Sequence, residues 1–149
     1  MTMHRRPLGQ GRLLAAVGAV LILVASFLAW YTAGGDAGGL NPISCNAFDG
    51  RCGTAGGMID FIIALLVLAL VALPYAIGDR PVAVDRGLSF LVLTVLGWLA
   101  LLYALLSFLT QGDLTGLRPD RAPGAWLALV GLIVLSRATY LISRGGDRV

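Results

Sequence analysis

The sequence predicts an all-α fold, a four-helix transmembrane bundle with both termini in the cytoplasm. The chain of 149 residues is 58% hydrophobic and 13% charged, with a mean hydropathy of +0.86. Ordinary soluble domains are about 45–50% apolar and about 25% charged. The apolar residues gather into four long runs, and the arginines are divided unequally between the connecting segments. Because a soluble fold of this size could not bury so much apolar surface, lipid must take the place of the missing core.

The four apolar runs account for the predicted helices. The hydrocarbon core of a bilayer is about 30 Å thick, so a spanning helix needs about 20 apolar residues. The uncharged runs 13–33, 61–78 and 87–110 meet this length, and the run from Ala122 meets it if Arg137 is tolerated. We therefore predict a single membrane domain over residues 1–149, with spans at about 13–33, 58–78, 87–110 and 122–143.

The orientation of the bundle follows from the arginines. With the N-terminus inside, the cytoplasmic segments hold Arg5, Arg6, Arg12, Arg80, Arg86, Arg144 and Arg148, and the outer loops hold Arg51, Arg118 and Arg121. This excess fits the positive-inside rule. Trp30, Tyr31 and Trp126 fall at the outer ends of spans, as interfacial aromatic residues do. The first run is too long for a signal peptide and lacks a small-residue cleavage site, so we expect it to be a retained span.

Small residues and one proline within the spans bear on helix packing. Five small residues would let neighbouring helices approach closely: Ala15, Gly18, Ala19, Gly97 and Gly131. Trp98 falls in the middle of the third span, so we expect it to pack against other helices. Pro74 removes one backbone hydrogen bond near the end of the second span and is expected to kink it.

Cys45 and Cys52 are the only cysteines, and both fall in the longest predicted loop, residues 34–57, on the outer side. Disulfides persist on the oxidising side of a membrane. A bridge would close a short loop and contribute about 2.5 kcal/mol in the chain-entropy model, so we predict a structural disulfide. A redox-active pair is the alternative, although thiol oxidoreductases of the membrane carry a C-x-x-C pair and these cysteines are spaced more widely.

Asp60 is the first of two candidate intramembrane polar residues. We expect it in the first turn of the second span, where the positive end of the helix dipole and headgroup water both favour a carboxylate. An acid within a span is also a functional candidate by default. A proton or ion site is therefore the functional alternative, and an ion pair with Arg51 is a structural one.

Arg137 is the second candidate. It falls well inside the fourth span, roughly 18 Å along the helix from Ala125. Burying a guanidinium in lipid costs a few kcal/mol or more unless the side chain reaches the interface. We expect Arg137 to extend toward the phosphates of the inner headgroup layer. The alternatives are an ion pair with Asp79 or Asp85, and a substrate or lipid site.

One stretch of the first span carries a resemblance. Residues Phe27-Leu28-Ala29-Trp30-Tyr31 follow a Gly-Arg-Leu-Leu-Ala-Ala-Val-Gly run that starts at Gly11. Here the chain resembles small uncharacterised four-span membrane proteins of actinobacteria, whose first helix often ends in Phe-Leu-x-Trp-Tyr. The resemblance implies a multi-pass protein of the bacterial inner, or cytoplasmic, membrane, and it implies no activity.

The sequence shows no catalytic set, cofactor motif or metal-ligand cluster, and its single charges form no nucleic-acid-binding stripe. We predict a non-enzymatic integral membrane protein, an accessory subunit of an envelope complex. Its partners would be the lipid bilayer and a second copy or another membrane protein. A small oligomeric transporter or pore is the alternative, and a membrane thiol redox protein is the second alternative. An acid inside the bundle would favour transport.

Overall fold

The computed structural model describes residues 9–33, 43–49, 55–77, 86–115, 120–121 and 123–144. Predictions that concern Arg51, Cys52, Asp79 and Asp85 lie outside these residues. The described part contains four α-helices: α1 (Gln10–Phe27), α2 (Ala55–Ile77), α3 (Arg86–Thr115) and α4 (Pro123–Ser143). All four are long and apolar enough to cross a membrane, which confirms the prediction of four helices of this kind.

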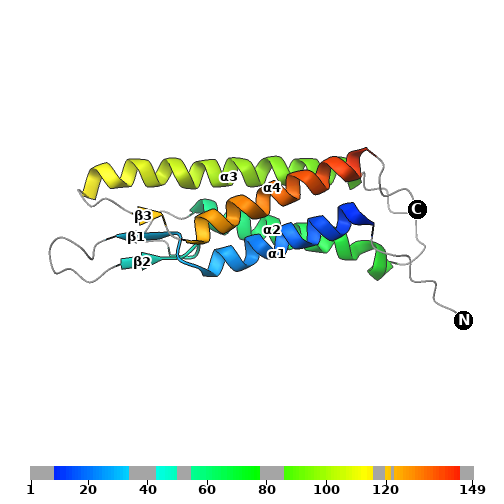
Figure 1. The fold of residues 1–149 in the computed structure, drawn as a ribbon, viewed down its shortest axis with the longest axis horizontal. Coiled ribbons are helices and arrows are strands. Elements are labelled where there is room, and N and C mark those ends of the chain that lie inside the picture. Colours follow the sequence, from blue (N-terminus) through cyan, green and yellow to red (C-terminus); the bar gives the residue numbers. More distant parts are fainter. Residues whose placement is uncertain are drawn as a thin grey trace, which may run out of the picture.

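The helices lie lengthwise in one bundle (Figure 1). A small sheet lies at one end of it, which we call the sheet end. At the opposite end, the far end, α1 begins and α4 finishes. Large apolar side chains remain exposed along the sides of all four helices, among them Val20 on α1, Leu66 on α2, Leu99 on α3 and Ile133 on α4. In water such a surface would be unfavourable, whereas it suits contact with lipid chains.

Helices α1 and α4 pack closely because small residues line the face that they share. A Cβ atom built on Gly18 of α1 would lie 2.9 Å from the carbonyl oxygen of Gly131 on α4 and 3.0 Å from the backbone nitrogen of Leu135. A Cβ on Gly131 would lie 2.7 Å from Cγ1 of Ile22. Ala15, Ala19 and Ala25 of α1 are also fully buried. The predicted close approach at Gly18 and Gly131 is therefore confirmed.

The sheet was not predicted. It contains β1 (Tyr31–Ala33), β2 (Ile43–Cys45) and β3 (Asp120–Arg121), in the order β2-β1-β3 with antiparallel pairing. Tyr31 of the central strand faces Cys45 on one side and Arg121 on the other. The prediction that the first span continues to Ala33 was wrong, because the helix ends at Phe27 and the chain then turns into β1.

Backbone hydrogen bonds hold the turn after α1. The amide of Trp30 donates to the carbonyl of Cys45 over 2.7 Å, and the amide of Gly124 donates to the carbonyl of Ala29 over 2.9 Å. These bonds join the segment after α1 both to β2 and to the start of α4. The ends of two helices and the sheet therefore form one hydrogen-bonded unit at the sheet end.

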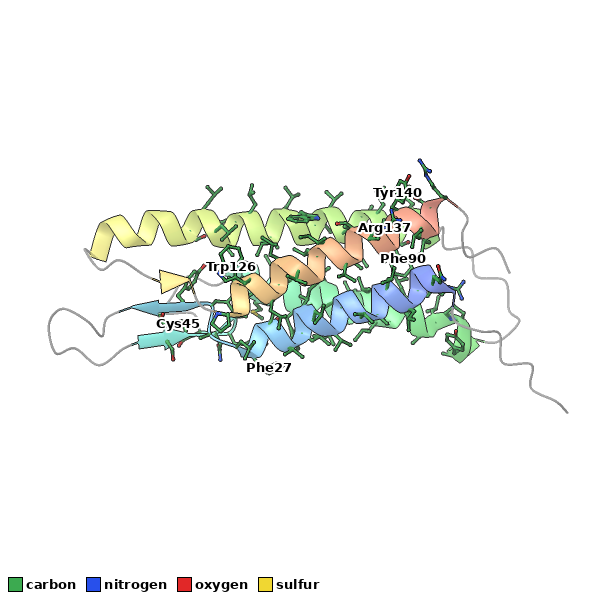
Figure 2. The ribbon with its side chains drawn as sticks, viewed as in Figure 1. Phe27, Cys45, Phe90, Trp126, Arg137 and Tyr140 are labelled. Atoms are coloured by element: carbon green, nitrogen blue, oxygen red, sulfur yellow. The ribbon has the colours of Figure 1, made fainter. Side chains whose placement is uncertain are left out.

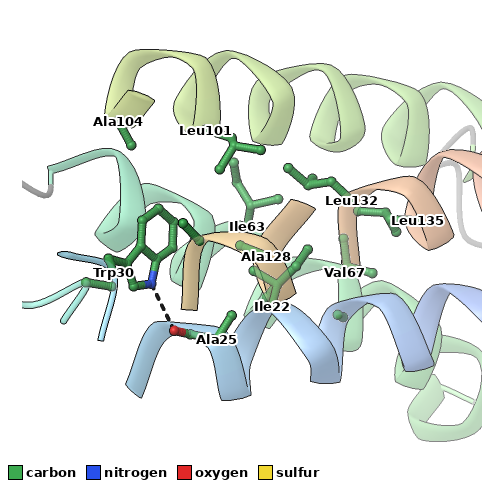
Figure 3. Close-up of a cluster of buried hydrophobic side chains, with 14 of the residues drawn as sticks. Ile22, Ala25, Trp30, Ile63, Val67, Leu101, Ala104, Ala128, Leu132 and Leu135 are labelled. Atoms are coloured by element: carbon green, nitrogen blue, oxygen red, sulfur yellow. Dashed lines mark hydrogen bonds between the residues drawn. The ribbon is translucent and has the colours of Figure 1, made fainter. Parts of the chain in front are cut away.

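The other helix limits differ modestly from the predicted spans. Helix α2 begins at Ala55, three residues before the predicted start, and continues through Pro74 to Ile77. Helix α3 continues beyond the predicted span to Thr115. The kink expected at Pro74 stays a prediction. Figure 3 shows the core between the helices, where Ile22, Val67, Leu132 and Leu135 are buried together.

Candidate functional site

Asp60 lies deeper in α2 than its sequence context indicated. Because the helix begins at Ala55, Asp60 is outside the first turn, which holds no acidic residue. At 1.5 Å per residue it lies about 7.5 Å along the axis from Ala55. The prediction that Asp60 is stabilised in the first turn by the helix dipole was therefore wrong, since that stabilisation falls off within one turn.

The carboxyl group of Asp60 is sealed inside the bundle. The residue is 0% exposed, and neither carboxylate oxygen has a hydrogen-bond partner in the described part of the chain. It faces α3 at Gly97, where an added Cβ would lie 3.7 Å from Oδ1 of Asp60 and 2.7 Å from Cδ2 of Leu132. The same Cβ would lie 3.9 Å from Cγ2 of Ile63. Gly97 therefore leaves room for a polar group among apolar neighbours.

The residues between Asp60 and the sheet close the bundle at the sheet end. Gly57, one turn earlier on α2, lies so close to the loop after β2 that an added Cβ would meet Cβ of Ala47 at 2.8 Å. It also approaches the indole ring of Trp30. Trp30 is 1% exposed, and its Nε1 donates to the carbonyl of Ala25 over 2.9 Å (Figure 3). The prediction that Trp30 is an interfacial residue was wrong, because its ring is part of this closure.

Tyr31 and Trp126 were also predicted to lie at the membrane interface, and they differ in exposure. The ring of Tyr31 is buried, and its hydroxyl donates to the carbonyl of Ala104 on α3 over 2.8 Å. Burial raises the pKa of the Tyr31 phenol above its usual value, since the charged form would lose its water. Trp126, in contrast, is 53% exposed at the start of α4, as expected of an interfacial residue (Figure 2). Only one of these two aromatic residues faces outward.

The other buried polar side chains have partners. The hydroxyl of Ser26 donates to the carbonyl of Ile22 over 2.9 Å. Thr94 of α3 and Thr139 of α4 bond to each other over 2.8 Å across the helix interface. Within the described residues, Asp60 is thus the buried polar side chain whose hydrogen-bonding capacity is unused. No group of three potential metal ligands occurs in the same residues.

Trp98 is 37% exposed, and its indole group makes a polar contact with another helix. Its Nε1 donates to the hydroxyl oxygen of Ser136 over 2.9 Å, and that hydroxyl donates to the carbonyl of Leu132. The indole group and Ser136 thereby link α3 to α4 within the spans. The sequence indicated a packing residue at Trp98, but spacing along one chain does not show which residue of another helix lies opposite.

Cys45 lies in β2 with its side chain buried, at the sheet end of the molecule (Figure 2). Its strand partner is Tyr31, so the cysteine belongs to the packed region between Asp60 and the sheet end. The bridge to Cys52 stays a prediction, because Cys52 lies outside the described residues. Burial of Cys45 next to the central strand means that such a bridge would fasten the following loop to the sheet.

Arg137 is exposed on the outer surface of α4 and does not point into the bundle. Figure 2 places it near the far end, beside Tyr140. The guanidinium carbon of Arg137 lies 5.5 Å from the centre of the Tyr140 ring, and that of Arg144 lies 4.4 Å from the same point. The predicted ion pair with Asp79 or Asp85 lies outside the described residues. Arg137 and Asp60 are therefore not brought together.

Comparisons with known proteins add nothing to these observations. No family model, curated protein or solved structure matches this chain.

Proposed function

We propose that this chain is a non-enzymatic, multi-pass membrane protein of the small transporter or pore class, and that Asp60 binds a proton inside its bundle. The observation that carries the proposal is the fully buried carboxyl group without a hydrogen-bond partner. An acid inside the bundle is the feature that separates transport from the accessory-subunit hypothesis. We therefore prefer a transport function to the accessory-subunit hypothesis.

The physical argument concerns the cost of charge. A carboxylate in an apolar interior is costly unless it is paired or hydrogen-bonded. A proton is the one cation that a single carboxyl oxygen can hold without further ligands, whereas Na⁺ or Ca²⁺ needs several oxygens. In the closed arrangement Asp60 is therefore best described as a neutral acid. Loss of the proton would favour a state in which the closure at the sheet end admits water.

Proton flux in reconstituted vesicles tests the proposal. When the medium outside proteoliposomes containing the wild type is made acidic, the vesicle lumen should acidify, as reported by a trapped pH-sensitive dye. Asp60→Asn keeps the size of the side chain but cannot bind a proton as an acid does, so it should lose the flux. Asp49→Asn, in the surface loop after β2, is the matched control and should keep it.

Infrared spectra separate the two parts of the proposal. The wild type should show the carbonyl stretch of a protonated carboxylic acid that disappears in Asp60→Asn. A wild type with this band but without flux would defeat the transport class and leave a neutral structural acid. A wild type whose Asp60 absorbs as a carboxylate at neutral pH would defeat proton binding itself.

An accessory subunit of an envelope complex is the second candidate, and an aromatic group at the sheet end favours it. The rings of Phe27, Phe48 and Phe61 lie with centroids 5.0–6.0 Å apart. Phe27 is 65% exposed and Phe48 is also exposed. A photo-crosslinking residue at Phe48 should then capture one discrete membrane protein in cells, and the same residue at Leu88 near the far end should not. Capture of lipid alone at both positions would contradict the subunit role.

The proposed location and orientation rest on the sequence. The resemblance around Trp30 supports the bacterial cytoplasmic membrane, and the distribution of arginines supports cytoplasmic termini. Gly116→Cys should react with a membrane-impermeant thiol reagent added outside cells, and Val82→Cys should not. The reverse labelling pattern would overturn the orientation. A membrane thiol redox protein remains the third hypothesis, and the state of its cysteines is tested separately below.

A further inference from the structure

Two arginines share one tyrosine ring on the outer surface of α4. Arg137, Tyr140 and Arg144 are spaced by three and four residues, so they lie on one stripe of the helix. The guanidinium carbons lie 5.5 Å and 4.4 Å from the centre of the Tyr140 ring. The two positive groups are therefore less than about 10 Å apart by the geometry of the shared ring. All three side chains are exposed on the surface of the bundle.

Helix geometry explains how the three side chains meet. The Cα–Cβ bonds of a helix tilt toward its N-terminus, so a long side chain lies over the preceding turn. The ring of Tyr140 therefore leans toward Arg137, and the side chain of Arg144 leans toward Tyr140. The amide of Arg144 still donates to the carbonyl of Tyr140 over 3.2 Å, which continues the helical pattern and keeps Arg144 on the stripe.

The position along α4 matches the membrane interface. The candidate span is Pro123–Ser143, and Arg144 follows it directly. Arg137 lies six residues before Ser143, or about 9 Å along the axis. Its guanidinium lies next to the ring of Tyr140, and aromatic and basic residues near the end of a span are those that meet headgroups. Two positive groups therefore lie at and just before the end of the candidate span, where long basic side chains can reach lipid phosphates.

We infer that Arg137, Tyr140 and Arg144 form a binding site for the headgroup of an anionic phospholipid. Each guanidinium offers several N–H donors that suit phosphate oxygens. The Tyr140 ring holds both guanidinium groups by cation–π contacts and so orders the site before lipid arrives. An anion bound between the two guanidinium groups would also reduce the repulsion between their like charges. This site is independent of Asp60 and of the transport hypothesis.

Native mass spectrometry in detergent tests the inference. Delipidated full-length protein is mixed with equal amounts of phosphatidylglycerol and phosphatidylcholine, and bound lipids are counted by mass. The wild type should retain phosphatidylglycerol in preference. Arg137→Gln and Arg144→Gln should each lower that retention by about fivefold, the effect of one basic residue near an anionic lipid surface. Arg121→Gln, at the sheet end, removes the same charge and should leave retention unchanged.

Variants of Tyr140 separate the ring from its hydroxyl. Tyr140→Phe keeps a ring for both guanidinium groups and should retain the lipid preference, whereas Tyr140→Ala should weaken it. Three results would overturn the inference. Equal retention of both lipids would show that no anionic site exists. Unchanged retention in both arginine variants would show that those charges are used elsewhere, as in an ion pair with Asp79 or Asp85. Displacement of the lipid by millimolar inorganic phosphate would show a site for the free anion.

Discussion

The hydroxyl group of Tyr31 donates a hydrogen bond to the backbone carbonyl of Ala104, and this bond joins the central strand of the sheet to α3. The two residues lie 73 positions apart in the sequence, so no local pattern indicates the contact. Next to this bond, Gly56 of α2 lies against the backbone of α3 at Ala100 and Ala104. The sheet and α2 therefore both contact α3 at Ala104.

Tyr31→Phe should destabilise the protein without unfolding it. The substitution keeps the buried ring and removes one hydrogen bond, which contributes about 0.5–1.5 kcal/mol in a typical case. Thermal unfolding in detergent micelles would measure the loss. Tyr103→Phe removes a hydroxyl from an exposed tyrosine of the same helix α3 and should have little effect. Equal stability of Tyr31→Phe and the wild type would show that the bond does not contribute.

The same tyrosine predicts a loss of stability at alkaline pH. Burial raises the pKa of Tyr31, so the folded protein favours the neutral phenol. This stabilisation is fully present below about pH 10, where an unfolded tyrosine begins to ionise, and it is lost as pH rises through the folded pKa. The sequence has no lysine, so no lysine side chain titrates over this range. Above about pH 10, the free energy of unfolding should fall more steeply with rising pH for the wild type than for Tyr31→Phe.

Gly18→Ala should separate α1 from α4. The added methyl group would lie 2.9 Å from the carbonyl oxygen of Gly131 and 3.0 Å from the nitrogen of Leu135, and backbone atoms cannot move aside as a side chain can. Overpacking of this kind costs about 1–3 kcal/mol. Unfolding in mixed micelles should show the loss. Val20→Leu adds bulk to an exposed position of α1 and serves as the control. Unaltered stability of Gly18→Ala would contradict the close packing.

Cys45 and Cys52 should be joined in the mature protein. Peptides from protein that is alkylated before lysis and digested without reduction should have the mass of a disulfide, two hydrogen atoms below the dithiol. Cys45→Ser together with Cys52→Ser should lower stability by about 2–3 kcal/mol in the chain-entropy model and leave membrane insertion intact. Alkylated thiols at both positions would rule out the bridge. A ratio of disulfide to dithiol that changes when reductant is added to cells would favour the redox hypothesis.

The four helices were predictable because hydropathy reports directly on burial in lipid. A run such as 87–110 has no alternative in a bilayer, since only a helix satisfies its backbone within the chain. The end of α1 was not predictable in this way. The apolar run continues past Phe27 without a glycine or proline, so composition does not mark the turn at Leu28. The turn depends on bonds from Trp30 to Cys45 and from Gly124 to Ala29.

The error at Asp60 has a related cause. Gly56 and Gly57 are poor helix formers, which favoured a helix start at Met58 and a place for Asp60 in the first turn. In the structure both glycines are helical because each lies against a neighbouring segment that a side chain would displace. Tertiary packing therefore overrides local preference, and it moves Asp60 a turn deeper. The partner surface at Gly97 lies on another helix, so no local pattern in the sequence marks it.

The close packing of α1 against α4 also constrains how the protein is made. Of the four described helices, α1 leaves the ribosome first and α4 last, and β3, which pairs with β1, precedes α4. At synthesis rates of about 5–20 residues per second, the interval between them is on the order of ten seconds. During that interval the small-residue face around Gly18 has no α4 to cover it. A nascent chain that stops before Pro123 therefore presents an uncovered helix face to insertion factors and membrane proteases, and only a chain that includes α4 covers it.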